Sequence, residues 1–462
     1  MPSRGERPFN GCRRARHATS APLNPTALRP PGFAARAAAT GLLATVLDDR
    51  RPLDAALDGD GAFGALPLRD RALARAILGT TLRRLGTIEA ILNRLVTRRP
   101  RADELLWRTL QTTAAQVLFM EVADHAAVSL ALDQLDANPR LRPFKGLANA
   151  VLRRIARERD ALIAAAETPG SDTPPWLWQR WVATYGEATA ASIAAMHRLE
   201  AALDISVKSE PQAWAEKLGG AVLPTGSLRL LATGDVTALP GYAEGAWWIQ
   251  GAAAALPARL LGDVTGKAVA DLCAAPGGKT AELANRGANV TAVDISPPRM
   301  ARVADNLRRL GLGAETVVTD VLSWQPDRQF DAVLLDAPCT ATGTIRRHPD
   351  VAWLKQPEDI ASLAAMQTRM LERAVALLKP GGTLVFCTCS LEPEEGEAHL
   401  APSLTGLSLE VVPIAAAEIG GLAETVTADG GVRTLPSHLP DAHEARRGGL
   451  EGFFIMRLRK RL

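Results

Sequence analysis

The feature that most constrains this chain is the alternation of short apolar runs with helical segments that begins at Gly266. Such alternation is typical of a sheet of parallel strands connected by helices. Strands are expected at 268–273, 290–294, 315–320, 330–336 and 383–387, with helices at 279–286, 298–310 and 359–378. Two late apolar runs, 407–412 and 453–458, predict an antiparallel pair that closes the sheet. The C-terminal half is therefore predicted to be an α/β domain.

The first of these strands runs into the segment DLCAAPGGKT, residues 271–280. A strand that ends in small residues and glycines before a helix lets a ligand approach the backbone amides at the helix N-terminus. A nucleoside triphosphate loop is excluded, because Cys273 stands where that motif requires glycine. The absence of G-x-G-x-x-G counts against a dinucleotide.

Three successive strands end in a carboxylate, at Asp294, Asp320 and Asp336. Asp294 lies about 20 residues beyond the glycine turn, where a carboxylate accepts both hydroxyls of a ribose in nucleoside-binding α/β folds. Taken alone, Asp294 could equally cap the helix that starts near Pro297. Capping does not readily explain three carboxylates at one sheet edge, so we expect a nucleoside-type ligand there.

The chain has five cysteines, an odd number, and their spacing fits neither a disulfide framework nor a zinc finger. We therefore expect no metal site and a reducing, cytoplasmic setting. Cys273 and Cys387 lie inside or at the end of strands and are expected to be small core residues. Cys339 and Cys389 follow strand ends, where a thiol is partly exposed and its reactivity can be tuned.

Two thiols beside a nucleoside-type cofactor suggest methylation at carbon 5 of a pyrimidine. Carbon 5 is a poor nucleophile until a thiolate adds to carbon 6, and a second group must then help to expel that thiolate. Cys339 and Cys389 supply such a pair, and the residues alone do not decide which of them attacks.

The N-terminal half has a different texture. Residues 33–165 carry apolar residues three and four apart, which predicts an all-helical domain, and their arginines gather in 69–101 and 145–159. A solvated helix face and RNA binding explain these arginines about equally well. Residues 166–245 are expected to form a small mixed α/β linking domain with three tryptophans in its core. Residues 1–32 hold six arginines and one glutamate in a chain of net charge +3, and are expected to be a disordered arm.

The ordered set DLCAAPGGKT, AVDIS, DAPCTATGTIRRHPD and TCSLEPEE resembles the Sun/RsmB branch of RNA cytosine-5 methyltransferases. The segments at 69–84 and 145–154 are similar to the signature helices of a NusB-like RNA-binding domain. The resemblance covers residues 33–462 and implies a multidomain protein, with an all-α NusB-like domain at 33–165 and an α/β Rossmann-like methyltransferase domain at 246–462. It also implies S-adenosylmethionine as the cofactor.

By position, the resemblance makes Cys389 the nucleophile on carbon 6 and Cys339 the residue that assists product release. Asp336 looks like the acidic residue near the base and the amino end of the cofactor. The remaining cofactor-binding residues that the resemblance implies are Cys273, Ala274, Ala275, Pro276, Gly277, Gly278 and Lys279, with Asp294 on the ribose, Asp320 on the adenine side, and Arg299.

One departure from the family pattern stands before the first strand, where Gly251 replaces a common Asp and puts a cap or hydrogen bond in doubt.

Two groups of basic residues are predicted to contact RNA. Those in the loop after the PC motif would bind phosphates next to the base that leaves its stack, and those in the helical domain would bind phosphates without reading the sequence. For the loop residues among them, solvent-exposed charge is the alternative. The predicted RNA contacts are Arg346, Arg347 and His348 after the PC motif, and Arg83, Arg84, Arg153 and Arg154 in the helical domain.

The leading hypothesis is methylation of carbon 5 of a specific cytosine in naive 16S ribosomal RNA. A hairpin loop is a plausible target, because extruding a base costs least there. The alternatives are a transfer RNA cytosine-5 methyltransferase and a non-catalytic NusB-like RNA-binding factor. RNA is the expected partner, and no obligate protein partner is inferred. The sequence contains no run of about 18 apolar residues, so no membrane span is expected.

Overall fold

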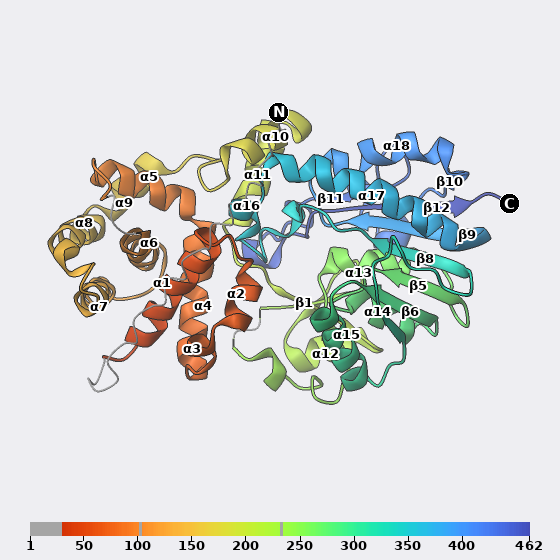
Figure 1. The fold of residues 1–462 in the computed structure, drawn as a ribbon, viewed down its shortest axis with the longest axis horizontal. Coiled ribbons are helices and arrows are strands. Elements are labelled where there is room, and N and C mark those ends of the chain that lie inside the picture. Colours follow the sequence, from red (N-terminus) through yellow and green to blue (C-terminus); the bar gives the residue numbers. More distant parts are fainter. Residues whose placement is uncertain (1–29, 101–103, 232–233) are drawn as a thin grey trace, which may run out of the picture.

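The computed structural model describes residues 30–100, 104–231 and 234–462. Of the arm expected over residues 1–32, only the last three residues fall within these ranges. Figure 1 shows the helical N-terminal part beside a larger α/β part, with helices of the middle segment between them. In the described ranges, no helix is long and apolar enough to cross a membrane.

The N-terminal part is a bundle of helices. Their bounds are α1 Phe33–Leu47, α2 Leu53–Gly59, α3 Gly61–Gly64, α4 Leu68–Arg83, α5 Leu85–Leu95, α6 Glu104–Phe119, α7 Asp124–Ala137, α8 Lys145–Arg157 and α9 Arg159–Ala166. The central helix, α6, packs against α1, α4, α7 and α8, and its Trp107 and Leu110 are buried. Ile77 and Leu78 of α4 are buried as well, which confirms the helical periodicity read from the sequence.

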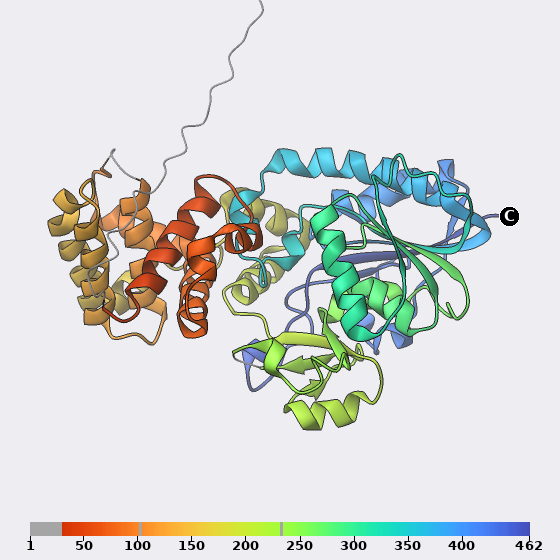
Figure 2. The same cartoon turned by 60° about the horizontal axis from the view of Figure 1, so that its bottom comes forward.

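The middle segment begins with α10 (Pro175–Tyr185) and α11 (Glu187–His197) and continues into a small antiparallel sheet of order β2-β3-β1-β4. Figure 2 shows this sheet projecting beside the larger one. Its elements are β1 Leu203–Val207, α12 Pro211–Leu218, β2 Ala221–Val222, β3 Leu228–Leu230 and β4 Trp247–Ile249. Trp181 of α10 is buried in a cluster with Ile345 and Leu391 from the C-terminal part.

The C-terminal part is built on a sheet of order β10-β12-β9-β8-β5-β6-β7, with β11 paired to β12. Its strands are β5 Ala268–Leu272, β6 Asn289–Asp294, β7 Glu315–Val318, β8 Phe330–Asp336, β9 Leu378–Thr388, β10 Leu409–Val411, β11 Val432–Thr434 and β12 Phe453–Lys460. Strands β5 to β9 are parallel, and β12 and β10 close the edge in antiparallel fashion. Each expected strand is present. β9 starts earlier than expected, because Leu378 already pairs with Phe330 ahead of an irregularity in the ladder.

Helices cover both faces of this sheet (Figure 1). Their bounds are α13 Ala252–Arg259, α14 Gly278–Asn285, α15 Pro297–Leu310, α17 Pro357–Leu377 and α18 Glu397–Gly406. The short helix α16, Val351–Leu354, lies instead against the helical part, where Trp353 and Leu354 pack on the cluster of α1 and α4. Side chains alternate between the faces: in β8, Ala332 and Leu334 pack with residues of α13, whereas Val333 and Leu335 pack with residues of α17. The faces are therefore filled with apolar residues, and polar groups are left to the strand ends.

The helical part docks on the segment that follows β8. The N–H of Leu53 donates to Asp350 Oδ2 at 2.9 Å, and Trp353 Nε1 donates to the carbonyl of Leu82 at 2.9 Å. His348 Nδ1 lies 3.5 Å from Asp54 Oδ2. The first turn of α2 is thereby held by the same loop that carries the predicted RNA contacts.

Glycine at position 251 leaves α13 without a side-chain cap of its own. The N–H of Ala252 donates instead to Asp204 Oδ2 at 3.1 Å, and the N–H of Ala253 to Glu451 Oε2 at 3.3 Å. A Cβ at Gly251 would lie 1.8 Å from Glu451 Oε1. Two carboxylates from distant parts of the chain thus serve the helix N-terminus, and Glu451 occupies the space that a side chain at 251 would need.

Gly251→Asp is expected to lower the free energy of unfolding by about 1–3 kcal/mol, because the new side chain overlaps Glu451 and sets two like charges together. An N-cap Asp in open space would instead stabilise the helix relative to Gly by roughly a few tenths of a kcal/mol. Urea titration followed by tryptophan fluorescence measures the difference. Addition of Glu451→Ala is expected to recover part of the loss, whereas a gain from Gly251→Asp alone would contradict this account.

Candidate active site

Two thiols meet at the carboxyl edge of the large sheet. Cys339 follows β8 and Cys389 follows β9, and these strands pair in parallel with Asp336 opposite Cys387. The Sγ atoms of Cys339 and Cys389 lie 3.4 Å apart. Both residues are partly exposed, so the pair is open to a ligand at this edge.

A close backbone contact fixes the loop that carries Cys339. The N–H of Gly343 donates to the carbonyl of Cys389 at 3.0 Å, and the N–H of Gly452 donates to the carbonyl of Gly343 at 2.9 Å. A Cβ at Gly343 would lie 1.9 Å from the Gly452 carbonyl oxygen. Position 343 therefore accepts only glycine if the two loops are to stay in contact.

The environment of Cys339 favours its protonated form. The pKa of Cys339 is raised well above its usual range by the contact with Cys389, by burial and by nearby negative charge that includes Glu395. Cys339 therefore keeps its proton at neutral pH, and either sulfur can be the donor in the contact between the two thiols. Burial also raises the pKa of Cys273 and of Cys387, as expected for the two cysteines assigned to the core.

Lys279 and Asp336 form an ion pair next to the thiols. Lys279 Nζ lies 2.8 Å from Asp336 Oδ2, and the thiol of Cys387 donates to Asp336 Oδ1 at 3.5 Å. Burial lowers the pKa of Lys279, but Asp336 and the adjacent cysteines outweigh it and raise the pKa above its usual value. Lys279 thus stays an ammonium ion at neutral pH and holds the carboxylate in place.

The turn after β5 has the backbone of a ligand cradle. Cys273 and Gly277 have φ angles of 63° and 98°, so the chain reverses sharply between β5 and α14. Asp294 at the end of β6 accepts from the N–H of Ala275 at 3.2 Å and of Ser296 at 2.9 Å. The predicted residues 273–279 and Asp294 are therefore in direct contact.

Arg299 joins this group, because its guanidinium donates to the carbonyl of Ala275 at 2.6 Å and lies 3.6 Å from Asp294. Asp320 follows the adjacent strand, β7, and accepts from the N–H of Leu322 at 3.0 Å. Ile295 and Val318 next to them are 65% and 50% exposed. Large apolar side chains left this open form a surface that a flat ligand would cover.

Asp271 is a site residue that the sequence analysis did not single out. It is fully buried; Oδ2 accepts from Thr280 Oγ1 at 2.6 Å, while Oδ1 has no protein partner. Burial raises its pKa to about 7, and the charges of Asp336 and Asp294 add to the effect. The available signal was its position as the first residue of DLCAAPGGKT.

The predicted RNA contacts occupy different settings. Arg346 is buried, and its guanidinium donates to the backbone carbonyls of Gly448, Glu200 and Arg446. Arg347 pairs with Glu451.

In the helical part, Arg83 donates to the carbonyl of Arg346 at 3.3 Å, and Arg84 lies 3.0 Å from Glu167. Arg153 and Arg154 of α8 are exposed, with Asn149 and Glu158 as partners.

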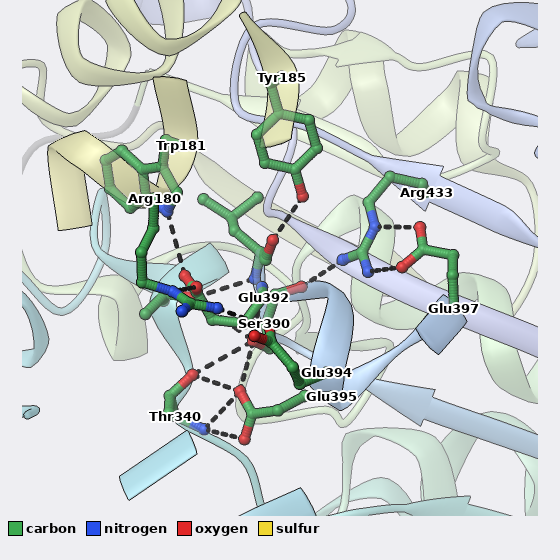
Figure 3. A network of polar contacts seen from close by, with 12 residues as sticks. Arg180, Trp181, Tyr185, Thr340, Ser390, Glu392, Glu394, Glu395, Glu397 and Arg433 are labelled. Atoms are coloured by element: carbon green, nitrogen blue, oxygen red, sulfur yellow. Dashed lines mark hydrogen bonds and ion pairs between the residues drawn. The ribbon is translucent and has the colours of Figure 1, made fainter. Parts of the chain in front are cut away.

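A polar network behind the thiols was also not singled out from the sequence (Figure 3). Glu392 is 1% exposed and accepts from Arg180 Nε at 2.6 Å and from Trp181 Nε1 at 3.1 Å. Arg433 pairs with Glu397, with Nη2 2.5 Å from Oε2. The visible signal was the acidic run LEPEEGE directly after the TCS motif.

Known proteins resemble both parts of this chain. Family models match residues 258–459 (16S rRNA methyltransferase RsmB/F) and 34–157 (NusB family). The chain is 37% identical to ribosomal RNA small subunit methyltransferase B of Vibrio cholerae, covering 79% of this chain and 88% of the relative. It is 34% identical to the protein of that name from Cronobacter sakazakii, covering 85% and 91%.

Among solved structures, the crystal structure of PH0851 matches with a TM-score of 0.71 at 22% identity, covering 94% of this chain and all of that chain. This likeness confirms the predicted fold, a helical N-terminal domain followed by a methyltransferase sheet. The resemblance read from the motifs and the predicted cofactor, S-adenosylmethionine, are confirmed as well. Sequence identity of this extent over most of both chains means that the protein belongs to the 16S rRNA methyltransferase RsmB/F family and is an S-adenosylmethionine-dependent RNA cytosine-5 methyltransferase.

Proposed function

We propose that the enzyme methylates carbon 5 of one cytosine in naive 16S ribosomal RNA through a covalent bond between Cys389 Sγ and carbon 6, and that Cys339 assists release. The observation that carries the proposal is the 3.4 Å separation of the two Sγ atoms beside Asp336. The curated relatives are named for methylation of small-subunit ribosomal RNA, which supports the ribosomal target.

The residues at the sheet edge fit S-adenosylmethionine. Asp271, Asp294 and Asp336 complement its positive sulfonium and amino groups, and the buried Oδ1 of Asp271 lacks a protein partner. Ile295 and Val318 expose apolar surface beside Asp294, suited to an adenine ring. In this assignment residues 273–279 hold the methionine part, Asp294 the ribose, and Asp320 and Arg299 flank the nucleoside.

The chemistry follows from the position of the thiols. Cys389 Sγ adds to carbon 6, which turns carbon 5 into a nucleophilic enamine carbon. When bound, S-adenosylmethionine supplies the electrophilic methyl group that carbon 5 accepts. A base supplied by solvent then takes the proton from carbon 5, the electrons of the C5–H bond form the C5–C6 double bond, and the C6–S bond breaks with its electron pair returning to Cys389 Sγ. Cys339 lies next to Cys389 and assists this step.

The exposed basic residues supply the grip on RNA. Arg153 and Arg154 lie on the solvent-facing side of α8, and Arg347 and His348 remain about one-third exposed near the thiol edge. Contacts of this kind bind phosphates without reading sequence and weaken as salt rises. The target base must leave its stack to reach the thiols, which is cheapest in a loop.

Cys389→Ala is expected to lower the rate of methyl transfer by about 10³-fold or more, because the thiol assigned to attack carbon 6 is removed. The assay uses labelled S-adenosylmethionine and small-subunit RNA from a strain that lacks the gene. Methylation that persisted unchanged would contradict the covalent mechanism. Bisulfite sequencing of total RNA from strains with and without the gene locates the mark, and its loss from transfer RNA alone would contradict the ribosomal target.

Cys339→Ala is expected to accumulate a covalent protein–RNA adduct, since attack by Cys389 proceeds and release fails. A slowly migrating band on a denaturing gel, dependent on S-adenosylmethionine, reports the adduct. The matched control combines Cys339→Ala with Cys389→Ala and should show no band. Free RNA in both lanes would mean that the roles of the two cysteines are assigned incorrectly.

Asp294→Asn is expected to weaken binding of S-adenosylmethionine by about 10-fold to 100-fold, because a hydrogen bond from a ribose hydroxyl to a charged acceptor is lost. Isothermal titration calorimetry measures the affinity without RNA. Asp305→Asn is the matched control, since Asp305 is exposed on α15 and, in the part of the chain that the structure describes, forms an ion pair with Arg308 alone. Equal affinity in both variants would contradict the assignment of Asp294 to the ribose.

A further inference from the structure

Glu395 is a fully buried carboxylate within the polar network behind the thiols. Burial raises its pKa, while hydrogen bonds from Ser390 and Thr340 oppose the rise. A carboxylate in such a setting is costly unless several donors satisfy it. The number and the origin of those donors indicate what Glu395 does.

The donors come from the residues next to the two thiols (Figure 3). The N–H of Thr340, which follows Cys339, donates to Glu395 Oε1 at 2.9 Å and Oε2 at 3.2 Å, and its hydroxyl donates to Oε2. The hydroxyl of Ser390, which follows Cys389, donates to Oε2 at 2.5 Å. One carboxylate therefore joins the loop after β8 to the loop after β9.

The other neighbours of the thiols are held by the same small group. The hydroxyl of Thr388, which precedes Cys389, donates to the carbonyl of Glu395 at 2.8 Å. Gln367 Nε2 of α17 donates to the carbonyl of Pro338, which precedes Cys339, at 2.8 Å, and to Glu395 Oε1 at 3.2 Å. Both chain neighbours of both cysteines are thus bonded to Glu395 or to its partner Gln367.

We propose that Glu395 is a positioning residue that sets the distance between Cys339 Sγ and Cys389 Sγ by holding the two thiol-bearing loops together. The inference rests on the proposed function, in which these thiols act in sequence on one base. Glu395 reaches neither the cofactor cradle nor the surface, so it acts only through the loops. A displacement of a thiol by about 1 Å from its reactive position lowers the rate by about 100-fold. By fixing the distance between the two Sγ atoms, Glu395 prevents such a displacement.

The test measures thiol spacing apart from catalysis. Phenylarsine oxide forms two As–S bonds with a close pair of thiols and releases water, so its affinity for the full-length protein with S-adenosylmethionine bound reports whether Cys339 and Cys389 can be bridged. Glu395→Ala is expected to weaken that affinity by about 10-fold and to lower kcat by about 100-fold with KM for RNA nearly unchanged. A Cys339→Ser variant gives the background without a pair.

Glu394→Gln is the matched control: Glu394 is the preceding residue, its side chain is 47% exposed, and its only ion pair among the described residues is with Arg180. It should leave arsenical affinity and kcat unchanged. Glu395→Gln keeps the shape and one oxygen for the N–H of Thr340, so it should retain most of both properties. Glu395→Asp keeps the charge, but its shorter side chain cannot reach both loops. If the alanine variant fails to fold, the arsenical affinity of Glu395→Asp tests the proposal in its place.

A folded Glu395→Asp or Glu395→Ala protein with wild-type arsenical affinity would overturn the proposal. An equal loss in Glu394→Gln would overturn it too, because the effect would then belong to the acidic segment as a whole. If the wild-type protein binds the arsenical but methylates no RNA, the proposed function fails while the spacing role stands. The two failures are therefore distinguishable.

Discussion

The parallel pairing of β8 with β9, with Asp336 opposite Cys387, is the contact on which the rest of the site depends. It brings two loops distant in sequence to one edge and sets the carboxylate of one strand beside the thiol of the other. Side chains alternate along a strand, so Cys387 and Cys389 face the same side while Thr388 faces the other. If β9 were shifted by one residue, Cys387 and Cys389 would point to the other face of the sheet.

Two kinds of stabilisation meet at this edge. On the cofactor side, backbone amides and Arg299 hold Asp294, and the ammonium of Lys279 holds Asp336. On the thiol side, the contacts are mostly hydrogen bonds from hydroxyl and amide groups to the buried Glu395. Salt screens buried contacts only weakly. The site therefore keeps its shape at salt concentrations that weaken RNA binding by the exposed arginines.

Much of this architecture could be predicted from local pattern. The alternation of apolar runs with helical segments predicts the strands, the carboxylates at their ends and the closing antiparallel pair. For example, β8 begins and ends at the expected residues, 330 and 336. The convergence of Cys339 and Cys389 follows once their strands are taken as neighbours. Both conclusions use only separations of a few tens of residues and the shared edge of parallel strands.

The remainder depends on contacts between distant segments, which no local pattern encodes. Glu451 fills the space beside Gly251 from 200 positions away, and Trp181 reaches Glu392 across 211. Arg346 could be read as a solvent-facing charge or a phosphate contact, yet its guanidinium serves three backbone carbonyls. Tertiary packing decides whether an arginine faces solvent or a backbone carbonyl, and the neighbouring sequence does not distinguish the two settings.

The two hydrogen bonds from α10 to Glu392 have a consequence for where the catalytic segment can be cut. The family model of the methyltransferase spans residues 258–459, but Arg180 and Trp181, which satisfy the buried Glu392 beside the TCS motif, lie well before it. A catalytic segment cut at residue 258 would lose both donors and would expose Glu392 to solvent. The linking helix α10 and the thiol loop therefore form one polar unit, although they lie in different parts of the sequence.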